Sequence, residues 1–134
     1  MDKTNFENLE IYQLSEKLAD EIWNIVLGWN NLAQDTIGKQ MIRSADSIGA
    51  NIAEGSGRGT AQDNRRFLRM ARGSLYETRH WLRRAHKRSL LLLKQTGSLS
   101  PIIKELTPKL NSYIRSVDLT IKTKTKDQKS KINA

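Results

Sequence analysis

The residues with the clearest chemical potential are five arginines and a tyrosine, spaced at alternating steps of four and three positions. This set, called here the arginine stripe, consists of Arg65, Arg69, Arg72, Tyr76, Arg79 and Arg83. Such steps place side chains along one line of an α-helix. A guanidinium group donates several hydrogen bonds to phosphate oxygens, and a tyrosine ring can stack on an unpaired base. The stripe therefore predicts a surface that follows an RNA or DNA backbone without reading its sequence.

Two further basic residues are predicted to belong to this nucleic-acid-binding surface. Lys87 extends the positive field one turn beyond Arg83, and Arg58 lies in the glycine-rich loop of residues 55–60. Arg58 can either contact phosphate or brace the turn. Two alternatives for the stripe stay open: a plain solvated face, or pairing with acidic residues of a partner subunit. The acidic residues that the first segment offers for such pairing are Glu10, Glu16, Asp20 and Glu21.

The distribution of charge also favours a polyanionic partner. The chain has a formal net charge of +9 and a sequence pI near 10.0. Residues 58–88 hold ten Lys and Arg against two acidic residues, and residues 122–134 hold five Lys against one Asp. The remaining residues are net acidic, so the positive charge is concentrated in one segment and one tail. Positive charge gathered in this way is typical of nucleic-acid-binding proteins.

The sequence predicts no catalytic, metal or cofactor site. There is no cysteine, and the two histidines, His80 and His86, are six positions apart and do not share a helical face. Glu77 and His80 have the spacing used by di-iron bundles, but those sites need a second such pair and further glutamates. The glycine-rich loop lacks the Lys-Ser or Lys-Thr pair of a phosphate-binding P-loop. We therefore expect a protein that is not an enzyme and that needs no cofactor.

Four amphipathic segments carry these residues. Apolar side chains recur at helical steps in residues 5–27, 35–54, 61–93 and 101–122, and no strand pattern is present. Ser100 and Pro101 predict the start of the fourth helix, and the apolar phase survives Pro108, which predicts a kink there. Short connections between such helices predict an all-α fold, an up-down-up-down antiparallel four-helix bundle over residues 1–122. Residues 123–134 are predicted to be a disordered lysine-rich tail, because they cannot bury enough apolar surface.

The same periodicity predicts which side chains form the core. In the second segment the apolar face is Ile37, Met41, Ala45, Ile48 and Ile52. In the third segment it is Phe67, Ala71, Leu75, Thr78, Leu82 and Ala85. In the fourth segment it is Ile103, Leu106, Leu110, Tyr113, Val117 and Ile121.

The end of the second helix carries a structural motif. We expect Asn51 and Glu54 to form a buried hydrogen-bond network with Arg58, Gly73 or Ser74. Small side chains let helices approach closely. The small residues predicted to do so are Ser44, Ser47 and Gly49 on the second helix and Gly73 and Ser74 on the third. Gly55 is predicted to end the second helix with a positive φ.

Residues 40–58, QMIRSADSIGANIAEGSGR, resemble the signature of the bacterial four-helix-bundle family named after proteins encoded in 23S rRNA intervening sequences. The resemblance continues through residues 67–68, 71–75 and Glu77, and it includes the opening residues 6–12, so it covers the first three helices. Gly49 stands where family members usually have proline. The resemblance implies a bundle that assembles into a pentameric barrel. It also implies a relation in fold to the accessory variability determinant of diversity-generating retroelements, which binds nucleic acid and partners a reverse transcriptase.

The predicted function follows from the stripe and the resemblance together. No apolar run is long enough to span a membrane, and the N-terminus lacks a signal-peptide pattern, so we expect a cytoplasmic protein without a membrane partner. The first hypothesis is a non-catalytic, oligomeric, basic scaffold that binds RNA or DNA, as an accessory subunit to a reverse transcriptase or in association with rRNA. The alternative is a protein–protein interaction module whose arginine stripe pairs with an acidic partner or with sister subunits.

Overall fold

The computed structural model describes residues 5–133, and every element within them is helical. The elements are η1 (Asn5–Asn8), α1 (Glu10–Leu27), α2 (Asn31–Ala33), the single π-helical turn η2 (Gln34–Gly38), α3 (Lys39–Ser56), α4 (Ala61–Lys87) and α5 (Leu93–Asn133). None of the described helices is both long and apolar enough to cross a lipid bilayer.

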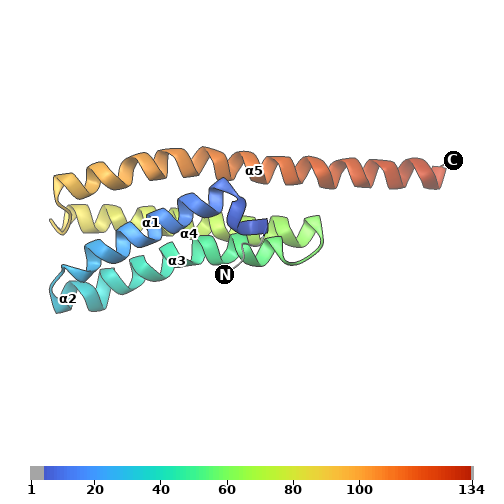
Figure 1. The fold of residues 1–134 in the computed structure, drawn as a ribbon. Coiled ribbons are helices and arrows are strands. Elements are labelled where there is room, and N and C mark those ends of the chain that lie inside the picture. The colour runs from blue at the N-terminus through green and yellow to red at the C-terminus, as the bar shows by residue number, and fades with distance from the viewer. Residues whose placement is uncertain (1–4, 134) are drawn as a thin grey trace.

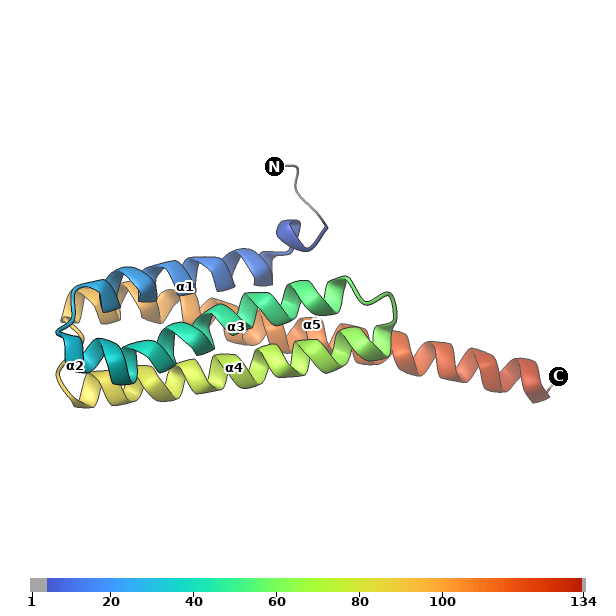
Figure 2. The same cartoon turned by 90° about the horizontal axis from the view of Figure 1, so that it is seen from below.

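The four long helices lie side by side, and the chain reverses its direction between each of them and the next (Figure 1). Each long helix contacts two neighbours: α1 packs on α3 and α5, and α4 packs on α3 and α5. As a result, α1 lies diagonally opposite α4. The view from below shows the same arrangement, with α5 extending far beyond the other three helices (Figure 2).

The core lies between the four long helices. Its largest fully buried apolar side chains are Leu18, Ile22, Met41, Ile48, Ile52, Leu68, Leu75, Leu106 and Leu110. Every side chain predicted for the core faces of the second and third segments is buried. Burial of one Leu or Ile stabilises a fold by about 1.5–3 kcal/mol, so these faces fix how α3 and α4 pack.

The core face of α5 differs from the prediction. Its buried apolar residues are Leu99, Ile102, Leu106, Leu110 and Ile114, whereas Ile103, Tyr113 and Val117 are only partly buried. The helix also starts earlier than predicted: α5 begins at Leu93, and the side chain of Gln95 accepts a hydrogen bond of 2.9 Å from the backbone N–H of Leu92 at this start. Pro101 therefore lies inside the helix and is not its first residue, and α5 is continuous through Pro108 as well.

The connection between α4 and α5 begins earlier than the sequence predicts. Ser89 adopts a positive φ of 59°, which ends the helical path just after Lys87, so the third helix does not reach residue 93. The indole Nε1 of Trp29 donates a hydrogen bond of 3.0 Å to the carbonyl oxygen of Leu90. This bond ties the α4–α5 connection to the segment that follows α1.

The end of α3 corrects two predicted roles. Gly55 is inside α3 and buried, and the glycine with positive φ is Gly59, at 85°. A Cβ at Gly55 would lie 2.7 Å from Asn64 Oδ1 and 2.9 Å from Phe67 Cβ, so Gly55 lets α3 approach α4 closely. Gly73 does not have this role, because it is exposed and a Cβ there would meet no atom within 4 Å.

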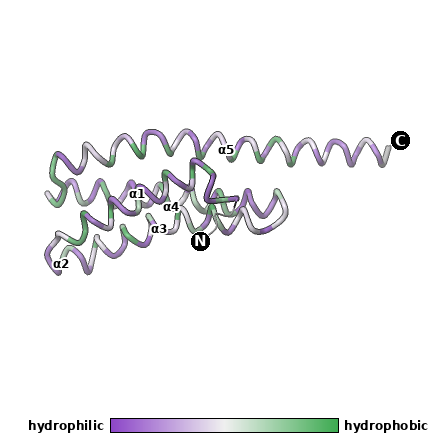
Figure 3. The backbone as a smooth tube through the Cα atoms, in the orientation of Figure 1, coloured by the Kyte–Doolittle hydropathy of each residue, from purple (hydrophilic) through white to green (hydrophobic). Residues whose placement is uncertain are grey.

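The C-terminal end of α5 also differs from the predicted disordered tail. The helix continues to Asn133, and residues 122–131 are all exposed. This end projects away from the bundle and is mostly hydrophilic (Figure 3). The exposure of residues 123–131 agrees with the prediction that this tail buries too little surface to pack on the bundle, whereas its helical backbone differs from the prediction.

Candidate nucleic-acid interface

The arginine stripe lies on α4, a helix of 27 residues, to one side of the face that is buried in the core. At its start, the Thr60 side chain accepts a hydrogen bond of 3.2 Å from the backbone N–H of Asp63, which caps the helix. Since α5 packs along one side of α4, the stripe runs beside α5. The structure divides it into two halves with different surroundings.

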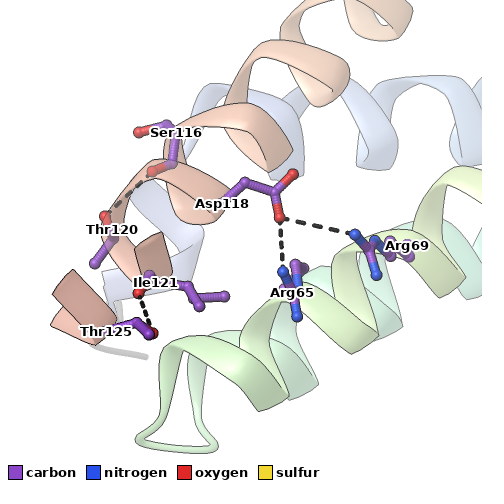
Figure 4. Close-up of polar contacts among 7 residues, drawn as sticks. All are labelled: Arg65, Arg69, Ser116, Asp118, Thr120, Ile121 and Thr125. Carbon is purple, nitrogen blue, oxygen red and sulfur yellow. Dashed lines mark hydrogen bonds and ion pairs between the residues drawn. The ribbon is translucent and has the colours of Figure 1, made fainter. Parts of the chain in front are cut away.

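In the N-terminal half of the stripe, two arginines meet one carboxylate. Asp118 of α5 lies 3.0 Å from Arg65 Nη1 and 3.7 Å from Arg69 Nη2 (Figure 4). The side chains of Arg65 and Asp118 are 30% and 27% exposed, whereas that of Arg69 is 52% exposed. Arg65 is thus the more fully engaged of the two, and part of the positive charge here is already neutralised.

Two other predicted binding residues also have partners within the chain. Arg72 Nη1 donates a hydrogen bond of 3.2 Å to Asn111 Oδ1 of α5. Arg58 lies 2.9 Å from the carboxylate of Glu54, and its guanidinium stands 4.9 Å from the centre of the Phe67 ring. Arg58 therefore braces the turn between α3 and α4.

The C-terminal half of the stripe, together with the neighbouring Lys87, is different. Arg79, Arg83 and Lys87 are exposed and form no ion pair with any residue that the structure describes. Tyr76, at the centre of the stripe, is 49% exposed. The helix dipole favours positive charge in the last turn of α4, where Lys87 lies. This half is the part of α4 that can bind an external anion.

A groove of about 580 Å³ opens between this half of α4 and the first turns of α5. Its lining residues are Arg79, Leu82, Arg83, Arg84, His86, Lys87, Leu91, Thr96, Leu99, Ser100, Ile103 and Lys104. None of them is acidic. The stripe therefore borders a cationic hollow as well as an open helix face.

The predicted motif residues near the end of α3 form only local contacts. Asn51 Nδ2 donates a hydrogen bond of 2.8 Å to the carbonyl oxygen of Ser47 one turn earlier. Glu54 pairs with Arg58 at the surface, with side chains 52% and 46% exposed, so the expected buried network is absent from this region. The carbonyl oxygen of Ser74 accepts a hydrogen bond of 2.8 Å from Thr78 Oγ1.

The buried polar contact between α3 and α4 is instead made by two hydroxyl groups that the sequence did not single out as partners. Thr78 Oγ1 lies 2.9 Å from Ser44 Oγ, and both residues are buried. Ser44 in turn donates a hydrogen bond of 3.1 Å to the carbonyl oxygen of Met41. Ser44 donates its one hydroxyl hydrogen to Met41, and the one hydroxyl hydrogen of Thr78 is within reach of both Ser44 Oγ and the Ser74 carbonyl oxygen, so neither buried hydroxyl lacks a partner.

The opposite side of the bundle carries negative charge. A hollow of about 390 Å³ between α1 and α3 is lined by Glu16, Asp20 and Asp46 together with small residues such as Gly49 and Ala53. Partial burial raises the pKa of Asp46 above its usual value, and the nearby Asp20 carboxylate raises it further. In the described part of the chain, no three His, Asp or Glu side chains are grouped so as to hold a metal ion.

Sequence reasoning missed the contribution of α5 to the candidate interface. Lys104, Leu99 and Ile103 line the groove, although the stripe itself contains only residues of α4. Lys104 belongs to the cationic rim and Leu99 to the core. No periodic signal within α4 could have identified them, because their position depends on where α5 begins.

Comparisons with known proteins agree with this architecture. The sequence profile described as 23S rRNA-intervening sequence protein matches residues 7–112. A crystal structure of a protein of unknown function from the S23 ribosomal protein family of Bacteroides thetaiotaomicron is similar, with a TM-score of 0.71 and 27% sequence identity, over 78% of this chain and 95% of that chain. Among curated proteins, no significant match is found. Because the matching profile spans most of the sequence, the chain belongs to the 23S rRNA-intervening sequence protein family.

Proposed function

We propose that this protein is a non-catalytic scaffold, an up-down-up-down four-helix bundle, that binds RNA or DNA through the C-terminal half of α4. The observation that carries the proposal is the row of exposed cations Arg79, Arg83 and Lys87, which have no ion-pair partner among the described residues. The family description, which refers to 23S rRNA, supports a nucleic-acid partner. Recognition is by charge and is not sequence-specific.

The spacing of the cations suits a phosphate backbone. Arg79 and Lys87 are eight residues apart, which is about 12 Å along an α-helix. Phosphates on one strand of duplex DNA rise by about 3.4 Å each, so this distance corresponds to roughly three or four phosphates. Tyr76, one turn before Arg79, can stack on a base of a flexible strand, a contact worth about 1–3 kcal/mol.

Assembly of several subunits would multiply this binding surface. The family resemblance favours a pentamer, and five chains that each carry a net charge of +9 would strongly attract a polyanion. A reverse transcriptase or an rRNA-containing particle is the kind of partner that the proposal implies. The exposed lysines of the α5 extension, such as Lys124 and Lys129, would add non-specific affinity.

A salt titration tests the proposed function. Binding of a fluorescein-labelled 20-nucleotide RNA and of a duplex DNA of the same length is measured by fluorescence anisotropy at several salt concentrations. Neutralisation of three or four phosphates predicts a slope of log affinity against log salt of about −2.7 to −3.6 for the duplex. Absence of binding even at low salt would contradict the proposal.

A second candidate function is supported by the acidic hollow between α1 and α3. Its three carboxylates, from Glu16, Asp20 and Asp46, could receive the unpaired arginines of a neighbouring copy. In that case the stripe would be an interface between subunits or with another acidic protein. Replacement of Asp20 and Asp46 by Lys would then dissociate the oligomer in a mass measurement, and replacement of Arg79 and Arg83 by Glu would do the same. Under the first proposal, the second replacement abolishes nucleic-acid binding and leaves the oligomer intact.

A further inference from the structure

The groove between α4 and α5 has a chemical character that simple phosphate binding does not require. Its lining includes four exposed cations, called here the rim: Arg79, Arg83 and Lys87 from α4 and Lys104 from α5. It also includes an apolar set, called here the floor: Leu82 and Leu99, which are 9% and 3% exposed, and the partly buried Ile103. Binding of phosphates alone requires the cations and does not require the apolar residues of the floor.

The position of the groove is fixed by contacts of the main chain. The α4–α5 connection is held by the bond from Trp29 Nε1 to the Leu90 carbonyl oxygen, next to Leu91 in the groove wall. The backbone N–H of Leu90 also donates a hydrogen bond of 2.9 Å to the carbonyl oxygen of Ala85. The hollow is therefore part of the folded bundle, and its volume of about 580 Å³ lies within the range of roughly 300–1,000 Å³ typical of ligand pockets.

We propose that this groove accepts an unpaired base of a single strand while the surrounding cations hold the flanking phosphates. The inference rests on the nucleic-acid binding proposed above and specifies its substrate class. A base offers a planar, weakly polar surface that suits the floor formed by Leu82, Leu99 and Ile103. Its phosphates offer the anions that suit the rim, which contains no acidic residue. In a duplex the bases are stacked and paired, so the phosphates of a duplex can contact the cations of the rim, whereas its bases cannot contact the apolar floor.

Tyr76 extends the same site along α4. It is one turn before Arg79 and is 49% exposed, so its ring is accessible to a second unpaired base. Thr96 and Ser100 in the groove wall supply hydroxyl groups that can exchange hydrogen bonds with the edge of a base. The groove and Tyr76 together would hold about two adjacent nucleotides of a single strand.

Three labelled probes of 20 nucleotides test this inference on the full chain. One is a single strand of mixed sequence, the second is its duplex, and the third is an abasic strand with the same phosphates and no bases. We expect the single strand to bind about tenfold more tightly than the abasic strand and the duplex at equal salt. Equal affinity for the three probes would overturn the groove inference and leave the proposed function in place. No binding of any probe at low salt would overturn both.

A variant that fills the groove gives a second, independent readout. Ser100→Trp places a large ring in the groove wall, whereas Ser98→Trp places the same ring on an exposed position of α5 outside it. We expect S100W to lower single-strand affinity about tenfold, to the level of the abasic strand, and S98W to leave it unchanged. Loss of affinity in both variants, or in neither, would contradict the inference.

If circular dichroism shows that S100W is unfolded, the affinities of the mixed-sequence and abasic strands for the unaltered protein test the inference without this variant. A glutamate-rich amphipathic peptide is the probe for a protein ligand. The inference would be overturned if this peptide bound the protein, if S100W blocked that binding, and if the protein showed no preference for strands with unpaired bases.

Discussion

Arg65 and Asp118 are separated by 53 positions in the sequence, yet Nη1 and Oδ1 of these residues are 3.0 Å apart. The pair joins the first turns of α4 to α5 near the point where α5 leaves the bundle. Because the same carboxylate also approaches Arg69, one acidic residue reduces the positive charge of half the arginine stripe. The stripe is therefore continuous in sequence and divided in structure.

Removal of this carboxylate should increase nucleic-acid affinity. Asp118→Asn releases Arg65 and Arg69 from their shared carboxylate and raises the local charge by one unit, so we expect affinity to rise about threefold to tenfold at low salt. Thermal unfolding should show a stability loss of no more than about 1 kcal/mol, because the ion pair is partly exposed. Asp20→Asn is the matched control, since it changes the net charge equally on α1, diagonally opposite α4. An equal rise in both variants would show that net charge alone determines affinity.

The buried hydroxyl pair of α3 and α4 should show strong coupling. Thr78→Val removes the contact with Ser44 and should cost about 1 kcal/mol of unfolding free energy, as is usual for a buried hydrogen bond. The double variant Thr78→Val/Ser44→Ala should cost less than the sum of the two single variants, because the contact between the two hydroxyl groups can be lost only once. Urea unfolding of the four proteins measures the coupling. Additive costs would mean that the two hydroxyl groups act independently.

Two glycines should respond in opposite ways to alanine. Gly55→Ala forces a Cβ against Asn64 and Phe67 of α4, and overpacking of this kind costs about 1–3 kcal/mol. Gly73→Ala, at an exposed position inside α4 with open space around it, should stabilise the protein by about 0.5–1 kcal/mol. Thermal denaturation distinguishes these results. Destabilisation by G73A comparable to that of G55A would instead support the close helix approach at Gly73 that the sequence predicted.

The raised pKa of Asp46 predicts a pH-dependent stability. Since burial and the Asp20 carboxylate favour the protonated form in the folded state, ionisation of Asp46 lowers stability as the pH rises through its folded pKa. Asp46→Asn should therefore raise the melting temperature slightly at pH 7, and the gain should vanish at pH values below the pKa of the unfolded carboxyl. Asp127→Asn, on the exposed extension of α5, should give no gain at either pH. A gain that is independent of pH would mean that the cause is not electrostatic.

The sequence predicts the core faces of α3 and α4 well because each has a single apolar stripe, such as Phe67, Leu75 and Leu82 on α4. It fails at the start of α5, where Ser100-Pro101 has the pattern of a helix N-terminus. A proline inside a helix costs about 3 kcal/mol. Burial of Leu99 and Ile102, each worth about 1.5–3 kcal/mol, offsets this cost and allows the helix to begin at Leu93.

For the candidate interface, the sequence identifies the cations and not their partners. The spacing from Arg65 to Arg83 is sufficient to predict a continuous stripe on one helix. Whether an arginine meets Asp118, Asn111 or solvent depends on the register between α4 and α5. That register is fixed by packing between residues far apart in the chain. The periodicity of one helix carries no information about such packing.

The most direct test compares two matched double variants of α4. Arg79→Gln/Arg83→Gln and Arg65→Gln/Arg69→Gln remove the same charge, at the same spacing, from the unpaired and the paired half of the stripe. Binding of a labelled 20-nucleotide single strand is measured at two salt concentrations, with the oligomer mass checked for each protein. The first variant should lose at least about tenfold in affinity and reduce the salt slope by about one to two, whereas the second should lose threefold or less. Equal losses in the two variants, or a larger loss in R65Q/R69Q, would contradict a binding surface centred on the unpaired half.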